Sequence, residues 1–136
     1  TMCPICLSGA TRIDTPQGSI AVKDIREGMN VWTSDGKGNR ITGVVVQTGR
    51  TAVPATHKII HVVLSDNREL FVSPRHPTAD GRLFGNLETG VLLDGGRVVS
   101  IDRVLYSQDY TYDILPSGPT GFYWANGILA GSTFEK

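Results

Sequence analysis

Three segments of the sequence carry side chains that are capable of covalent or proton-transfer chemistry, and the first contains Cys6. This cysteine is followed by Leu, Ser and Gly and precedes an expected strand at Arg12–Asp14. A thiolate at an accessible end of a β domain is a strong nucleophile. An unpaired cysteine is also often a small buried apolar residue. Taken alone, Cys6 therefore leaves both interpretations open.

The second segment is the run Ser73-Pro-Arg-His76-Pro77. Pro77 restricts the backbone of the preceding residue and lacks an amide donor, so we expect His76 to lie where the chain leaves a strand. The Ser73 hydroxyl lies within reach of the same turn. A histidine suits proton transfer near neutral pH, although a lone loop histidine is more often a surface residue.

The third segment contains Asp113 within Thr-Tyr-Asp-Ile and continues into Phe122-Tyr-Trp and Asn126-Gly127. An aspartate among apolar strand residues needs polar partners if it is buried. The three aromatic residues are most simply interpreted as core packing. Asn-Gly predicts a tight turn, because both residues tolerate positive φ.

A metal-binding or redox module is the competing hypothesis. Cys3 and Cys6 form a CxxC pair, and His57 and His61 lie four residues apart on one face of an expected strand. Two cysteines and two histidines can form a tetrahedral zinc site. A single CxxC is a weak zinc signal, and the chain lacks the βαβ pattern of thioredoxin-like proteins.

The elements that must position these residues are short strands separated by turn residues. Sixteen glycines and seven prolines in a chain with 40% apolar residues predict one all-β domain rather than disorder. Single helical turns are expected around Lys23–Arg26 and Leu83–Glu88. The expected strands are Arg12–Asp14, Ser19–Val22, Asn30–Thr33, Ile41–Thr48, His57–Leu64, Glu69–Val72, Arg97–Tyr106, Thr111–Leu115 and Gly127–Ala130.

Composition limits the partners. The 13 basic and 13 acidic side chains balance, which argues against nucleic acid and anionic membranes as partners. No apolar run approaches the roughly 20 residues of a membrane helix. We expect a soluble monomer without a cofactor, and a cytoplasmic location is favoured although the sequence does not specify it.

A faint internal repeat relates Asp24–Val31 (DIREGMNV) to Asn86–Leu93 (NLETGVLL). An apolar residue, two polar residues, a glycine and an apolar run recur at the same offsets. Two similar halves of the domain are one explanation, and two chance hairpin starts are the other.

Together, and in this order, the three segments resemble the Hint family of intein and hedgehog self-processing domains. CLSGATRIDTPQGSIAVKDIREGMNVWT resembles the family's opening block, VSPRHPTADG its histidine block, and TYDILPSGPTGFYWANGILAGS its closing blocks. The resemblance implies an all-β horseshoe of two pseudo-symmetric subdomains. It also implies a Hint domain at residues 6–131, with flanking residues at 1–5 and 132–136.

The resemblance further implies a mechanism that starts at Cys6. Its sulfur attacks the carbonyl of Ile5, His76 protonates the departing nitrogen, and Ser73 helps to hold the peptide. Asp113 accepts the thiol proton or orients a nucleophile. The covalently linked N-terminal partner is then released to water or a small nucleophile.

Three positions depart from the family pattern. Ala10 stands where an aspartate is frequent, and Thr120 or Gly121 stands where many members have a second histidine. Ser132 occupies the place of the asparagine whose cyclisation completes splicing. We therefore expect cleavage at Cys6 without splicing, and the inactive relic of such a domain is a further alternative.

Overall fold

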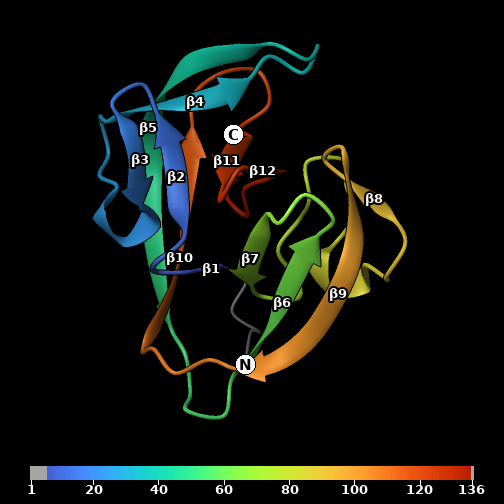
Figure 1. Cartoon of the computed structure of the whole chain (residues 1–136). Helices are drawn as coiled ribbons and strands as arrows, with labels where there is room; N and C mark the ends of the chain where they lie inside the picture. The colour runs from blue at the N-terminus through green and yellow to red at the C-terminus, as the bar shows by residue number, and fades with distance from the viewer. Residues whose placement is uncertain (1–5, 136) are drawn as a thin grey trace.

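The computed structural model describes residues 6–135, and nearly every regular element in this range is a β-strand (Figure 1). Single 3₁₀ turns occur at η1 (Val22–Asp24) and η2 (Phe84–Asn86). The strands are β1 (Leu7–Ser8), β2 (Arg12–Thr15), β3 (Gly18–Ala21), β4 (Asn30–Ser34), β5 (Arg40–Ala52), β6 (Lys58–Leu64), β7 (Glu69–Val72), β8 (Leu92–Leu93), β9 (Gly96–Leu105), β10 (Tyr110–Pro116), β11 (Tyr123–Ala125) and β12 (Ile128–Ala130). The all-β prediction is confirmed.

The larger sheet has eight antiparallel strands in the order β4-β5-β10-β1-β7-β6-β9-β8, and it is symmetric about the contact between β1 and β7. On each side of this contact a short strand is followed by two long strands and an outer hairpin strand. Figure 1 shows β5 and β10 in one half and β6 and β9 in the other. A smaller sheet, β12-β11-β2-β3, completes the fold.

The two segments of the internal repeat make equivalent backbone hydrogen bonds, so the repeat has a structural basis. Gly28 and Gly90 both adopt positive φ, at 91° and 94°. Each glycine and the residue after it form two backbone hydrogen bonds with one valine of the next long strand. In the first half, Gly28 N donates to the Val45 carbonyl at 2.9 Å, and Val45 N donates to the Met29 carbonyl at 2.8 Å. In the second half, Gly90 N donates to the Val98 carbonyl at 2.7 Å, and Val98 N donates to the Val91 carbonyl at 2.8 Å. The equivalence is therefore a fold-level pseudo-symmetry rather than a chance likeness of hairpins.

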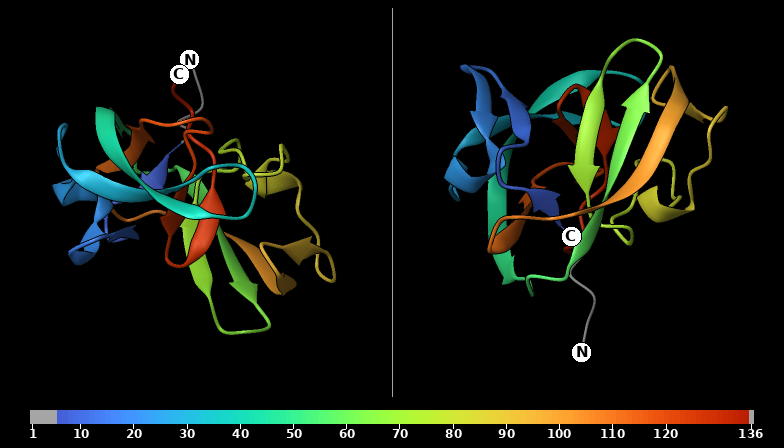
Figure 2. Two further views of the ribbon diagram at one scale, coloured as in Figure 1. Left: turned by 90° about the horizontal axis from the view of Figure 1, so that it is seen from above. Right: turned by 60° about the horizontal axis from the view of Figure 1, so that its bottom comes forward.

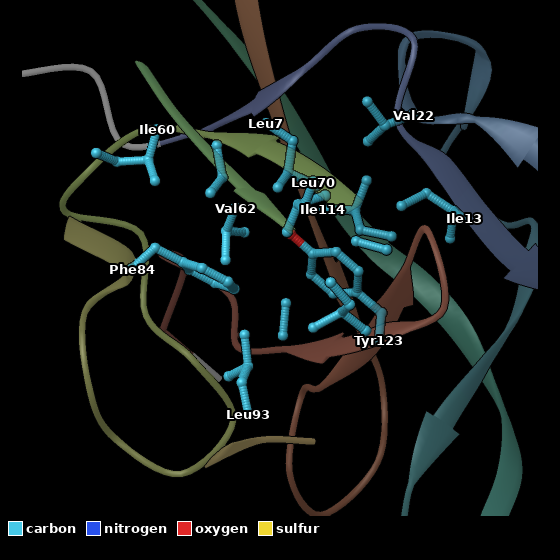
Figure 3. Packing of buried hydrophobic residues seen from close by; sticks show 14 of the residues in the cluster. Leu7, Ile13, Val22, Ile60, Val62, Leu70, Phe84, Leu93, Ile114 and Tyr123 are labelled. Atoms are coloured by element: carbon cyan, nitrogen blue, oxygen red, sulfur yellow. The ribbon is translucent and has the colours of Figure 1, made fainter. Parts of the chain in front are cut away.

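One apolar core spans both halves. Figure 3 shows Leu7 and Ile114 from one half and Val62 and Phe84 from the other in the same cluster, around the Tyr123 ring. These side chains are at most 1% exposed. Burying each large apolar side chain stabilises the fold by about 1.5–3 kcal/mol. The shared core joins the halves through the seam between β1 and β7.

Several elements differ from the sequence-based expectations. The helical turns are shorter than predicted and begin at Val22 and Phe84. Strand β5 extends to Ala52, well past the expected end. Strands β1, β8 and β11 were not expected. Figure 2 shows long β9 beside β6, and both lie close to the ranges expected for strands. Within residues 6–135 no helix is long and apolar enough to cross a membrane.

Candidate active site

Cys6 lies at the seam between the two halves. It directly precedes β1, whose Leu7 pairs with Val72 at the end of β7. The Ser73 amide donates a hydrogen bond to the Cys6 carbonyl at 3.0 Å, which continues the pairing past both strands. The cysteine is 5% exposed, and its Sγ lies 3.9 Å from Thr51 Oγ1. The seam therefore holds the backbone of Cys6 between both halves.

The loop after β7 delivers His76 to the same region. The His76 amide donates to the Ser73 carbonyl at 3.1 Å, and the His76 carbonyl accepts from the Phe84 amide at 3.0 Å. The ring is fully buried, and Nε2 lies 2.8 Å from the Gly131 carbonyl oxygen. Because a carbonyl oxygen only accepts, Nε2 carries a proton in this arrangement. The prediction that His76 lies where the chain leaves a strand is met, but the residue is not a surface histidine.

Asp113 lies on β10 and is 1% exposed. Since Leu7 pairs with Tyr112, the antiparallel register continued by one residue places Cys6 next to Asp113. Both carboxylate oxygens accept several hydrogen bonds, as expected for a buried charge. The donors to Oδ1 are Tyr123 Oη (2.5 Å) and Ile114 N (2.8 Å), and those to Oδ2 are Thr133 N (2.7 Å) and Thr133 Oγ1. Ser132 Oγ lies 3.4 Å from Oδ2.

Tyr123 connects Asp113 to His76 and was not expected to take part in the site. The interpretation of the aromatic segment as core packing holds for its ring, which is fully buried. Its hydroxyl, however, lies 2.5 Å from Asp113 Oδ1 and 3.3 Å from His76 Nε2. Burial first, and then the Asp113 charge, raise the pKa of Tyr123 well above its ordinary value, so the hydroxyl keeps its proton. No local motif marks this role.

The hydroxyl of Ser73 is buried and has no hydrogen-bond partner among the described residues. An unpaired buried hydroxyl is unfavourable, so it calls for a specific explanation, such as a role in a site. Ser73 follows β7 at the seam, directly beside the backbone of Cys6. Its predicted role in holding the peptide before Cys6 remains a prediction, because Ile5 lies outside the described residues.

The two other histidines are not part of this site. His61 stacks on Phe71 with ring centroids 4.1 Å apart and contacts Glu69 at 3.1 Å. His57 packs edge-on against Tyr106. Among residues 6–135 no three His, Cys, Asp or Glu side chains are grouped to hold a metal ion, and Cys3 lies outside this range. The structure therefore gives the alternative metal site at Cys3, Cys6, His57 and His61 no support.

His57 is expected to make stability depend on pH. Its Nε2 is buried without a partner among the described residues, and burial lowers its pKa from 6.5. The His57 imidazole therefore takes up a proton more readily in the unfolded chain than in the folded one. As a result, the free energy of unfolding falls as pH drops below about 6.5 towards the folded-state pKa. Denaturant unfolding at pH 7.5 and 5.5 should show a smaller pH effect in His57→Leu than in the parent.

The matched control is His61→Leu, since His61 is partly exposed beside Glu69. An unchanged pH dependence in His57→Leu would contradict the assignment of this effect to His57.

The chain is similar to a known protein family and to several solved structures. The profile of the Hint domain family matches residues 5–82, which is more than half of the chain. No curated protein matches the sequence. Solved inteins share the fold: the gp41-1 intein has 23% identity and a TM-score of 0.73 over 94% of this chain and 98% of that chain.

Two further structures cover nearly the whole of both chains. A DnaB intein from Synechocystis sp. PCC 6803 has 16% identity and a TM-score of 0.78, with 96% of this chain and 100% of that chain covered. A bacterial intein-like domain from Clostridium thermocellum has 20% identity and a TM-score of 0.76, with 96% and 99% covered. At these identities the structural likeness establishes the fold, and the profile match establishes the family. The chain belongs to the Hint domain family.

Proposed function

We propose that this Hint domain processes itself by an N-to-S acyl shift at the Ile5–Cys6 bond and then releases its N-terminal partner. The observation that carries the proposal is the hydrogen bond between the Ser73 amide and the Cys6 carbonyl, which fixes the cysteine at the seam that His76 and Asp113 also reach. Family membership supports self-processing in general. The arrangement of these side chains supports thioester chemistry in particular.

The proposed step is an isomerisation that needs no co-reactant. The Cys6 sulfur bonds the Ile5 carbonyl carbon, the carbon–nitrogen bond breaks, and the thiol proton ends on the Cys6 nitrogen. His76 Nδ1 is the ring nitrogen that exchanges this proton, since Nε2 already donates to Gly131. A proton transfer of this kind contributes about 10² to 10⁴ in rate. Water or a small nucleophile then attacks the thioester and frees the partner.

A fusion protein joined before Thr1 tests the proposal. Dithiothreitol or hydroxylamine at neutral pH should release a fragment that ends at Ile5, and intact mass spectrometry identifies its C-terminus. A fusion that stays whole under both reagents, while its circular dichroism shows the folded domain, would refute the acyl shift and favour an inactive relic.

We further propose that the domain comprises residues 6–131 and does not splice. Completing a splice requires an asparagine side-chain amide that attacks its own peptide carbonyl, and Ser132 has only a hydroxyl. In the fold, Ser132 Oγ donates to the Ile114 carbonyl at 2.7 Å. Because no asparagine stands at position 132 to complete the splice, an acyl group transferred to Ser132 or Thr133 would be lost by hydrolysis.

A dual-tagged fusion, with different proteins joined before Thr1 and after Lys136, is expected to give cleaved fragments but no ligated product. Gel analysis with antibodies against both tags measures this outcome. A band that carries both tags at the mass of the joined partners would show that splicing occurs without asparagine.

A further inference from the structure

The hydrogen bonds around Tyr123 have only one consistent set of directions. The Gly131 carbonyl accepts from His76 Nε2, so that nitrogen is a donor. The Asp113 carboxylate accepts the Tyr123 hydroxyl proton at 2.5 Å. The Tyr123 oxygen, 3.3 Å from Nε2, accepts the weaker branch of the same His76 N–H, which is shared with the Gly131 carbonyl in a three-centre hydrogen bond. A directed chain therefore runs from His76 through Tyr123 to Asp113.

We propose that Tyr123 is a positioning residue that couples Asp113 to His76 during the acyl shift. This inference rests on the proposed function, because it concerns the same site. Hydrogen bonds in such a chain polarise one another in a buried environment. The negative charge of Asp113 thereby stabilises the positive charge that His76 gains while it carries the proton from Cys6 Sγ to the Cys6 nitrogen. Neither Tyr123 nor Asp113 gains or loses a proton overall.

The hydroxyl, rather than the ring, carries this role. The ring packs in the apolar core, where phenylalanine would fill nearly the same volume (Figure 3). The next residue, Trp124, belongs to the opposite face of β11 and stacks against Arg40 at 4.3 Å. Tyr123 is thus the residue of the aromatic segment whose polar group enters the site.

The segment after β12 offers a second route between the two residues. Gly131 contacts His76, and Ser132 and Thr133 contact Asp113. Coupling through this segment would not need the Tyr123 hydroxyl. The experiment must therefore separate these two routes.

Tyr123→Phe is expected to slow thioester formation about tenfold or more, as loss of a hydrogen bond to a charged group predicts. Thiol-induced cleavage of the fusion before Thr1 gives the rate. Tyr106→Phe is the matched control, because this buried hydroxyl accepts from Gly9 N at 3.3 Å and donates to the Tyr110 carbonyl at 2.6 Å away from His76. The control should react within about twofold of the parent, and equal rates for Tyr123→Phe and the parent would overturn the proposal.

A double-mutant cycle with Asp113→Asn tests the coupling itself. Asp113→Asn should shift the ¹⁵N resonances of the His76 ring in the parent and leave them nearly unchanged in Tyr123→Phe. Equal shifts in both backgrounds would assign the coupling to the segment after β12 and overturn the proposal. If Tyr123→Phe fails to fold, the spectrum of the parent is itself a test. A His76 ring with its proton on Nδ1 and none on Nε2 would overturn the proposal.

The nuclear magnetic resonance readout does not require the acyl shift. If the coupling is present but the parent fusion never cleaves, the proposed function fails, whereas the hydrogen-bond coupling of Asp113 to His76 through Tyr123 stands. If the fusion cleaves but Asp113→Asn acts identically in both backgrounds, only the role of Tyr123 fails.

Discussion

Cys6→Ala is expected to abolish thiol-induced release of the N-terminal fragment, because it removes the only atom that forms the proposed thioester. Alanine leaves the seam almost intact, since the Ser73 hydrogen bond uses the backbone of residue 6. Intact mass spectrometry after overnight dithiothreitol should show uncleaved fusion only. Continued cleavage after Ile5 in this variant would exclude Cys6 as the nucleophile.

Cys6→Ser provides a chemical control for this result. A hydroxyl can form an ester, but it is a weaker nucleophile than a thiolate at neutral pH. Cleavage should therefore become slow with hydroxylamine and slower with dithiothreitol. A serine variant as fast as the parent would mean that the sulfur does not take part in the limiting step.

His76→Ala is expected to slow thioester formation by about 10² to 10⁴, the range for loss of a positioned acid–base group. The ring is fully buried and contacts both Gly131 and Tyr123. A time course of cleavage at several dithiothreitol concentrations separates slower thioester formation from slower thiol attack. Thermal unfolding of the variant distinguishes lost chemistry from lost structure.

His57→Ala and His61→Ala serve as controls, because the aromatic partners of both rings are not residues of the candidate site. His57 packs against Tyr106, and His61 stacks on Phe71. Both variants should cleave at close to the parent rate. Losses of equal size in all three histidine variants would point back to a shared metal site.

Much of the fold could be predicted because its signals are local. Alternating apolar residues and turn dipeptides identify long strands such as β6 and β9, and Asn126-Gly127 forms the expected turn with φ of 50° and 79°. The internal repeat was visible since Gly28 and Gly90 are needed at equivalent positive-φ positions. These preferences belong to the backbone and act within a few residues.

The missed strands show where local signals end. Strands β1 and β8 contain two residues each, which is too short for any alternation to be recognised. The second half of β5 contains glycine, arginine and threonine, and it is a strand because β10 pairs with it as far as Ala52. Pairing partners, rather than intrinsic preference, create these elements.

The all-β class, the repeated half and the candidate side chains at positions 6, 73, 76 and 113 can be recognised from the amino-acid sequence alone. The contacts of the Tyr123 hydroxyl with Asp113 and His76, and those of Gly131 with His76 and of Thr133 with Asp113, are apparent only in the folded chain. These contacts depend on the order of strands in the sheet, because pairing β1 with both β7 and β10 brings together residues that are far apart in the chain. A tyrosine hydroxyl has the same local sequence signature whether it meets water, a backbone carbonyl or a buried carboxylate.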